Sequence, residues 1–172
     1  HQDAKYIGLE PHNWVTAWVA ITDANEKNGC MRMLPGSHKE NLKTHEQKFD
    51  ENNLLTRGQT VKNVSLEKTE PIILKAGQVS LHHPTIVHGS GLNNSNDRRI
   101  GFVIQSYIGT NVNQVIGKMY VQKARREDKF NYHKYSKTPT ELMGKNEVTS
   151  QNKANEELSK IFYSGSKKIG KF

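Results

Sequence analysis

Short runs of β-branched and aromatic residues, separated by polar turns, fill the first 109 residues of the chain. The clearest run covers residues 14–22 and ends at the polar residues 23–25, a pattern typical of a β-strand. The same reasoning predicts further strands at residues 30–34, 70–75, 78–83, 85–88 and 100–107. The turn Ala76-Gly77 predicts a hairpin between the two strands that flank it. Many short strands of this kind predict a mainly β fold, a sandwich or barrel, and not an alternating β-α-β sheet.

A polar segment interrupts the predicted strands. Residues 37–63 carry one apolar pair, Leu54 and Leu55, in an otherwise polar sequence. A loop of this length inside a compact domain is either a lid over a site or partly disordered. Residues 37–63 are therefore our candidate for a lid.

The pattern changes after Gly109. Residues 138–141 have the spacing of a capping box with proline at the first helical position, and Gly165 is a suitable stop. Between them, apolar residues recur at helical spacing, at Ala154, Leu158, Ile161 and Phe162. We therefore predict a β-rich core of residues 1–109 and a C-terminal extension of residues 110–172, whose peripheral helices pack on the same domain.

Composition narrows the class of protein. The chain has 172 residues, of which 34% are hydrophobic and 24% charged, and its mean hydropathy is −0.79. This fits one polar globular domain. No apolar run approaches the roughly 18 residues that a membrane helix needs. The single cysteine, Cys30, cannot form an internal disulfide, so we expect a buried thiol and a reducing, cytoplasmic location.

The net charge of +8 is unevenly distributed. Residues 1–109 hold 12 Lys and Arg against 11 Asp and Glu, whereas residues 110–172 hold 13 against 6. A basic extension can attract nucleic acid, an anionic substrate or an acidic partner. Its basic residues are not interleaved with stacking aromatic residues, so we expect a solvated lysine-rich surface and do not expect nucleic acid to bind.

Two short motifs carry candidate chemistry. His1 and Asp3 are two residues apart, so in a strand their side chains would share one face. A Gly- and Asn-rich turn between His88 and Arg99 predicts a hairpin that sets these two residues opposite each other. Each motif alone is also consistent with an ordinary polar start or a hairpin that merely packs.

Together the motifs supply a specific set of ligands. His1, Asp3 and His88 are two imidazoles and one carboxylate, a set that suits Fe(II) and leaves positions open for a co-substrate and oxygen. Arg99 on the same face would bind the far carboxylate of a dicarboxylate. This is the chemistry of a 2-oxoglutarate-dependent oxygenase.

The sequence resembles the phytanoyl-CoA dioxygenase family in the order and spacing of several motifs. They are His1-Gln2-Asp3, residues 15–19, residues 28–39, and His88-Gly89-Ser90-Gly91-Leu92-Asn93 followed by Arg98-Arg99. The resemblance covers roughly residues 1–109. It implies a cupin-like double-stranded β-helix, or jelly roll, and an enzyme that uses Fe(II), O2 and 2-oxoglutarate. Such an enzyme hydroxylates an unactivated C–H bond of a small molecule and releases succinate.

The resemblance also assigns roles to residues. It implies that the iron ligands are His1, Asp3 and His88. It implies that Arg99 binds the distal carboxylate of 2-oxoglutarate and that Ser90 and Trp18 line the same pocket. Tyr6 falls where the family often has an aromatic residue near the site.

Several alternatives remain beside this interpretation. Related halogenases replace the carboxylate ligand by a small residue, and Asp3 argues against that activity here. A catalytically degenerate β-helix protein could bind metal or a partner at the same place. His82 has the parity of His88 along the chain, but Pro84 interrupts the alternation, so we do not expect His82 to be a ligand.

Two expectations concern the whole protein. In the family about half the chain, including one strand of the β-helix, precedes the His-x-Asp motif that here begins at His1. We therefore expect a fragment of a longer protein, with an open sheet edge and poor stability on its own. The basic extension is compatible with an acyl-CoA, a carrier-bound acyl group or a small carboxylate as substrate, and the sequence does not choose among them or predict an oligomeric state.

Overall fold

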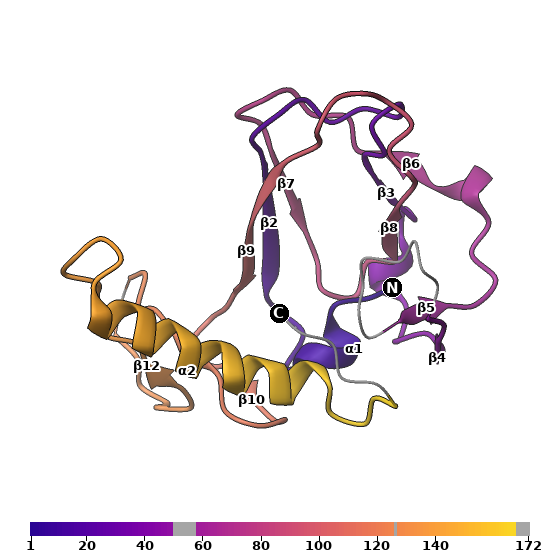
Figure 1. The fold of residues 1–172 in the computed structure, drawn as a ribbon. Coiled ribbons are helices and arrows are strands. Elements are labelled where there is room, and N and C mark those ends of the chain that lie inside the picture. The colour runs from indigo at the N-terminus through magenta and orange to yellow at the C-terminus, as the bar shows by residue number, and fades with distance from the viewer. Residues whose placement is uncertain (50–57, 126, 168–172) are drawn as a thin grey trace.

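Two three-stranded antiparallel sheets form the centre of the fold. The computed structural model describes residues 1–49, 58–125 and 127–167. One sheet has β2 in the middle, and its strands are β2 (Val15–Ala20), β7 (Val79–His82) and β9 (Gly101–Tyr107). The other has β3 in the middle, and its strands are β3 (Met31–Met33), β6 (Glu70–Pro71) and β8 (His88–Ser90). The two sheets stand opposite each other, and the chain passes between them at the top of Figure 1.

The predicted mainly β fold is confirmed, but both predicted hairpins are wrong. Strand β6 pairs with β3 and strand β7 with β2, so the two strands on either side of Ala76-Gly77 lie in different sheets. In the same way β8 pairs with β3, and β9 pairs with β2. His88 therefore lies opposite Met33 and not opposite Arg99. A turn signal marks where the chain reverses, but it does not say whether the next strand joins the same sheet.

Short elements join and flank the sheets. The helix α1 (Ala4–Ile7) follows directly on Asp3, whose backbone is already helical, so the predicted strand through residues 1–3 is wrong. Two-stranded pairs complete the described β-structure: β1 (Leu9–Glu10) with β10 (Asn113–Gln114), β4 (His45–Gln47) with β5 (Gln59–Val61), and β11 (Tyr120–Val121) with β12 (Lys134–Tyr135). Single 3-10 turns lie at η1 (Ser37–Lys39) and η2 (Leu66–Lys68).

The segment predicted as a lid contains η1 and the pair β4–β5. Leu54 and Leu55, its apolar pair, lie outside the described residues. Residues 37–49 and 58–63 are the described parts of this segment.

One long helix dominates the C-terminal extension. This helix, α2 (Lys145–Phe162), begins after Gly144, so the predicted start near residue 139 is wrong. Thr140 lies before the helix but contacts its first turn: its backbone N–H and its hydroxyl both donate to Oε1 of Glu147, at 3.1 and 3.0 Å. The helix runs beside α1 in Figure 1, and its Ile161 is fully buried.

The core consists of two apolar clusters. The first joins the two parts of the chain and contains Ala4, Ile7, Leu9, Trp14 and Val112, with Phe162 of α2 packed against it. The second lies between the sheets and contains Trp18, Ala20, Ala24, Cys30 and Met31. Cys30 is buried, as predicted.

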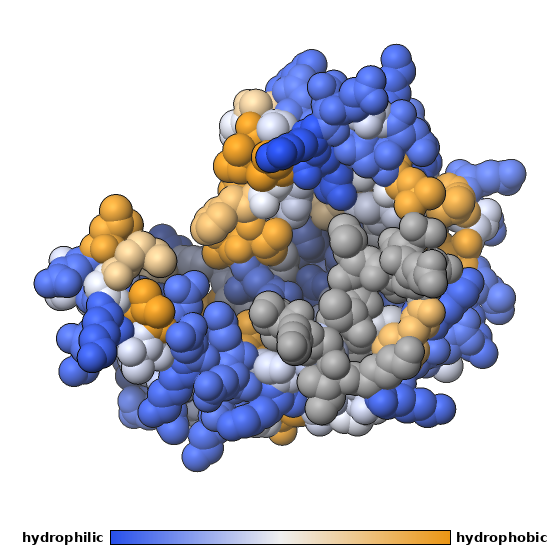
Figure 2. Space-filling model, in the orientation of Figure 1, coloured by the Kyte–Doolittle hydropathy of each residue, from blue (hydrophilic) through white to orange (hydrophobic). Residues whose placement is uncertain are grey.

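Apolar residues also remain on the surface. In Figure 2 they gather over the side of the sheet that carries β9. Phe102, Val103 and Ile104 of this strand are 60, 47 and 46% exposed. Among the described residues, no helix combines the length and apolarity needed to cross a membrane.

Candidate functional site

His1 and His88 face each other across a pair of backbone hydrogen bonds. The backbone nitrogen of His1 donates to the carbonyl of His88 at 2.8 Å, and the N–H of His88 donates back to the carbonyl of His1 at 3.0 Å. Residues that exchange both bonds are directly opposed and project their side chains to the same face. The two imidazole centroids are accordingly 4.1 Å apart.

Asp3 reaches the same point from the entrance of α1. Its Oδ1 lies 3.2 Å from Nε2 of His1 and 3.7 Å from Nε2 of His88. Gln2, between the two motif residues, turns away and donates from its amide to the carbonyl of Thr85 at 2.6 Å. The structure therefore brings His1, Asp3 and His88 together, although the segment is not the strand that the sequence predicts.

The cluster is shielded from solvent, and this changes its electrostatics. The side chains of His1, Asp3 and His88 are 12, 6 and 7% exposed. Burial opposes ionisation of Asp3, but the hydrogen bond with His1 and the neighbouring imidazoles outweigh it and hold the pKa of Asp3 well below its usual range. Burial, assisted by His1, lowers the pKa of His88 to about 4. At neutral pH the cluster thus offers an ionised carboxylate and a neutral His88 imidazole.

These donors fit a single metal ion. The three ligand atoms lie within 4.8 Å of one another, and this is the one such group found among the described residues. Adjacent ligands of an octahedral ion with bonds of about 2.1 Å are separated by about 3 Å, close to the 3.2 and 3.7 Å seen here. Nδ1 of His88 contacts the carbonyl of Ile86 at 3.0 Å, which places its proton there and leaves Nε2 free to bind a metal.

Arg99, Ser90 and Trp18 form a second group. A guanidinium nitrogen of Arg99 donates to Oγ of Ser90 at 3.4 Å, and its Cζ lies 5.6 Å from the centroid of the Trp18 ring. The predicted hairpin is absent, yet Arg99 and Ser90 still meet. Ser90 lies on β8 and Trp18 on β2, and Arg99 lies two residues before β9, the neighbour of β2, in the segment that runs from β8 to β9.

The two groups are held at matching positions on the two sheets. On β8, Ser90 is two residues beyond His88, and on β2, Trp18 is two residues beyond Thr16. Residues two apart in a strand share a face and lie about 7 Å apart. Thr16 contacts Asp3, and Trp18 contacts Arg99. In both strands, therefore, the earlier residue lies at the His1, Asp3 and His88 cluster and the later residue lies at Arg99.

Three further residues surround Asp3: Tyr6, which the family resemblance places near the site, His82, which is not expected to be a ligand, and Thr16, which the sequence does not single out. Thr16 donates from its hydroxyl to Oδ2 at 3.2 Å, and Tyr6 donates from its hydroxyl to Oδ1 at 3.0 Å. Nε2 of His82 lies 3.9 Å from Oδ2, and burial lowers the pKa of this histidine. His82 stands outside the three-residue group. The parity of Thr16 with Trp18 is the one sequence signal that could have pointed to Thr16.

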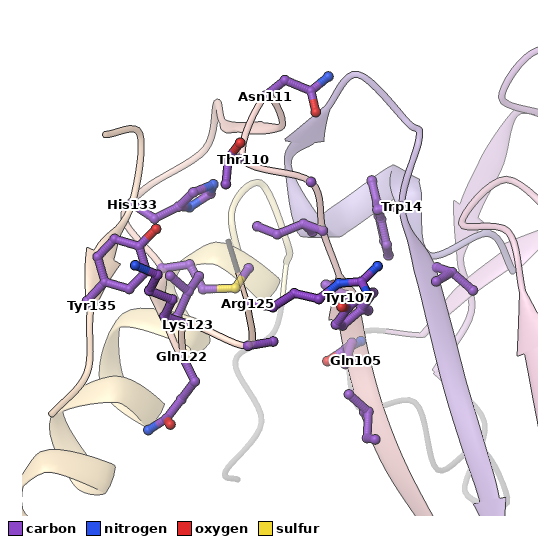
Figure 3. A pocket seen from close by; sticks show the side chains of 18 of the residues that line it. Trp14, Gln105, Tyr107, Thr110, Asn111, Gln122, Lys123, Arg125, His133 and Tyr135 are labelled. Atoms are coloured by element: carbon purple, nitrogen blue, oxygen red, sulfur yellow. The ribbon is translucent and has the colours of Figure 1, made fainter. Parts of the chain in front are cut away.

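Two cavities lie away from this cluster. A cavity of about 870 Å³ is bounded by Trp14 and Tyr107 on the sheet side and by Lys123, Arg125 and His133 from the extension, as Figure 3 shows. A more open hollow of about 610 Å³ is lined in part by His12, His38 and His83. None of the three clustered residues lines either of them.

Comparison with protein families and curated proteins identifies consistent relatives. Residues 1–101 match the family model described as Phytanoyl-CoA dioxygenase (PhyH). The chain is 30% identical over 95 residues to human peroxisomal phytanoyl-CoA dioxygenase, covering 54% of this chain and 28% of that protein. It is 30% identical over 119 residues to a probable alpha-ketoglutarate-dependent hypophosphite dioxygenase of Stutzerimonas stutzeri, covering 68% and 41%.

Solved structures agree with these relatives. The non-heme monooxygenase ThoJ in its apo form superposes with a TM-score of 0.81 at 27% identity, over 95% of this chain and 59% of that one. Its nickel complex superposes with a TM-score of 0.73 at 25% identity. The predicted jelly-roll class is thereby confirmed. The chain spans less than half the length of the curated relatives that it matches, and about three fifths of ThoJ.

Proposed function

The chain belongs to the phytanoyl-CoA dioxygenase family, and from this premise we propose that it forms the metal- and 2-oxoglutarate-binding part of an oxygenase. The reaction that we propose is hydroxylation of an unactivated C–H bond of a small molecule, coupled to conversion of 2-oxoglutarate to succinate and carbon dioxide. The observation that carries this proposal is the convergence of His1, Asp3 and His88 on one point.

The three clustered residues would hold Fe(II). Fe(II) carries two positive charges and the Asp3 carboxylate one negative charge. The loaded site would therefore keep one positive charge, which favours an anionic chelating co-substrate. When bound, Fe(II) supplies the activation of oxygen that 2-oxoglutarate drives. The presence of Asp3 supports hydroxylation over halogenation, because its carboxylate occupies the position that a halide would need.

Arg99 would hold the far end of the co-substrate. A guanidinium binds a carboxylate through two parallel hydrogen bonds and keeps its charge at any physiological pH. Ser90 and Trp18 fix its direction, one through a hydrogen bond and the other through its ring. Trp18 is buried, so its ring also shields one side of the guanidinium from water.

The segment of residues 37–49 is our candidate for a cover over the substrate. It is tied to Gln2, between His1 and Asp3: the N–H of Lys43 donates to Oε1 of Gln2 at 2.8 Å. The N–H of Gln2 in turn donates to Nε2 of His45 at 3.2 Å. A movement of this segment would therefore displace Gln2 and, with it, the backbone that carries His1 and Asp3.

The substrate class is the open part of the proposal. The two curated relatives are named for very different substrates, an acyl-CoA and hypophosphite. We propose a small molecule, with an anionic or acyl-thioester group favoured by the basic extension. A panel of such compounds, scored by stimulated succinate formation, would select among them.

Succinate formation from 2-oxoglutarate tests the proposal. Purified protein containing this chain should form succinate only with Fe(II), and Asp3→Ala should reduce the rate at least 100-fold. Arg99→Met should raise the KM for 2-oxoglutarate more than it lowers kcat, since it removes a binding contact distant from the metal. Succinate formation that is indifferent to Asp3→Ala would refute the proposal.

A further inference from the structure

The two carboxylate oxygens of Asp3 have different surroundings. Oδ1 faces the two imidazoles of the cluster and accepts the hydroxyl of Tyr6. Oδ2 faces the opposite way, where Thr16 donates its hydroxyl at 3.2 Å and Nε2 of His82 lies 3.9 Å away. The carboxylate therefore has a side that points to the cluster and a side that points to the β2–β7 pair.

Thr16 and His82 are directly opposed on neighbouring strands. The register of β2 and β7 pairs these two residues, so their side chains project from the same face of the sheet about 5 Å apart. Counted over the whole residue, Thr16, Asp3 and His82 are 3, 4 and 6% exposed. On the β7 side Thr16 is paired with His82, whereas on the β9 side it falls at a register shift between Val15 and Ala17.

The imidazole of His82 is held in this place by packing. Its Nδ1 is buried and has no hydrogen-bond partner among the described residues. Its ring lies 5.0 Å from that of His88, centroid to centroid. The ring thus packs on the Oδ2 side of Asp3. The hydroxyl of Thr16 is the group that donates a hydrogen bond to Oδ2.

We propose that Thr16 is a positioning residue of the metal centre, and that His82 assists it by keeping water from Oδ2 of Asp3. This inference rests on the proposed function. The hydroxyl of Thr16 satisfies Oδ2, so that Asp3 meets a metal through Oδ1 alone. A carboxylate that binds through one oxygen leaves more positions free for a chelating co-substrate, and groups that orient a ligand in this way commonly change metal affinity 10- to 100-fold.

Metal binding by Thr16 variants tests this inference without any turnover. Thr16→Val keeps the shape of the side chain and removes the donor, so we expect it to weaken Mn²⁺ binding about 10- to 100-fold. The visible spectrum of bound Co²⁺ should change as well, because the second carboxylate oxygen becomes free to coordinate. Thr16→Ser restores the hydroxyl and should bind Mn²⁺ within about 3-fold of the wild type. Should Thr16→Val fail to fold, Thr16→Ala carries the same expectation.

Thr69→Val is the matched control. Thr69 is also buried and hydrogen-bonded through its hydroxyl, to the carbonyl of Leu66 at 2.6 Å, but it does not contact the cluster. Its substitution should lower stability and leave Mn²⁺ affinity unchanged. Wild-type affinity and an unchanged Co²⁺ spectrum in Thr16→Val would overturn the inference and leave the proposed function standing. A wild-type protein that binds no Mn²⁺ through Asp3 would overturn both.

Discussion

The burial of His88 makes the stability of the metal-free protein depend on pH. The pKa of His88 is lowered to about 4 in the folded protein, from 6.5 in an unfolded chain. Between these values the unfolded chain binds a proton that the folded protein does not, so the free energy of unfolding falls as pH drops from about 6.5 to 4. Asp3, whose pKa is also lowered, extends the loss to lower pH.

Urea unfolding in the presence of a chelator measures this effect. At about 1.4 kcal/mol per pKa unit, we expect His88 to contribute a loss of up to about 3 kcal/mol across this range. His88→Gln should flatten the profile between pH 6.5 and 4. Equal slopes in wild type and variant would contradict the account of His88.

Gly101 is required by the close approach of Trp18. A Cβ on Gly101 would lie 2.1 Å from two atoms of the indole ring, which is itself buried in the core. Gly101→Ala should therefore displace Trp18 and lower the free energy of unfolding by about 1 to 3 kcal/mol. Gly91 is the control, since a Cβ there meets nothing within 4 Å. Unfolding is followed by tryptophan fluorescence. Equal unfolding midpoints for Gly101→Ala and Gly91→Ala would contradict this account, because they would mean that the indole can move aside at no cost.

At the scale of residues, the clustering of His1, Asp3 and His88 could be predicted from the sequence, and the residues that surround Asp3 could not. His1, Asp3 and His88 stand out because few residue types bind iron and they occur here in a restrictive order. Thr16 and His82 carry no such signal, since a threonine in a strand and a histidine before a proline have many ordinary uses. Their contact with Asp3 depends on the register of β2 with β7, which follows from packing over a long range.

At the scale of elements, the strands could be located but their partners could not. The strands predicted from residue type match β2, β3, β7 and β9 closely. Turns at Ala76-Gly77 and after Ser90 reverse the chain but deliver it to the opposite sheet. The capping-box spacing of residues 138–141 does not mark the start of α2, because Thr140 donates to Glu147, seven residues away, and not to a residue within one helical turn.

The helix α2 is attached to the core through its last turn. Ile161 is fully buried, and a Cβ on Gly117 would lie 2.8 Å from its side chain. Ile161→Ala should lower the free energy of unfolding by about 2 to 5 kcal/mol and expose α2 to limited proteolysis. Leu142→Ala is the control, because Leu142 is 98% exposed. Similar proteolysis rates for both variants would show that α2 does not depend on this contact.

At the scale of the whole molecule, β9 is the most exposed apolar element described. It lies at the edge of its sheet, and Phe102, Val103 and Ile104 are exposed on both of its faces. An exposed apolar edge strand is a template for pairing with another chain. We therefore expect the 172-residue chain on its own to self-associate at micromolar concentration.

Sedimentation velocity over a range of concentrations tests this expectation. The double variant Phe102→Ser and Ile104→Thr should shift the chain toward monomer, because it removes apolar area from one face of β9 while leaving the backbone unchanged. Leu66→Ser, at another exposed apolar position, should not. A wild-type chain that stays monomeric at all concentrations would contradict the expectation.

The central claim is that His1, Asp3 and His88 together bind one metal ion. A titration with Mn²⁺, in which the electron paramagnetic resonance signal of the free ion is measured, tests this claim most directly. Asp3→Asn preserves the shape of the ligand and removes its charge, and Asp23→Asn removes a carboxylate that bonds to Lys75 at the surface. We predict one Mn²⁺ per chain in the wild type and in Asp23→Asn, and an affinity lowered by more than about 100-fold in Asp3→Asn. Binding that survives Asp3→Asn unchanged, or is lost equally in Asp23→Asn, would contradict the claim.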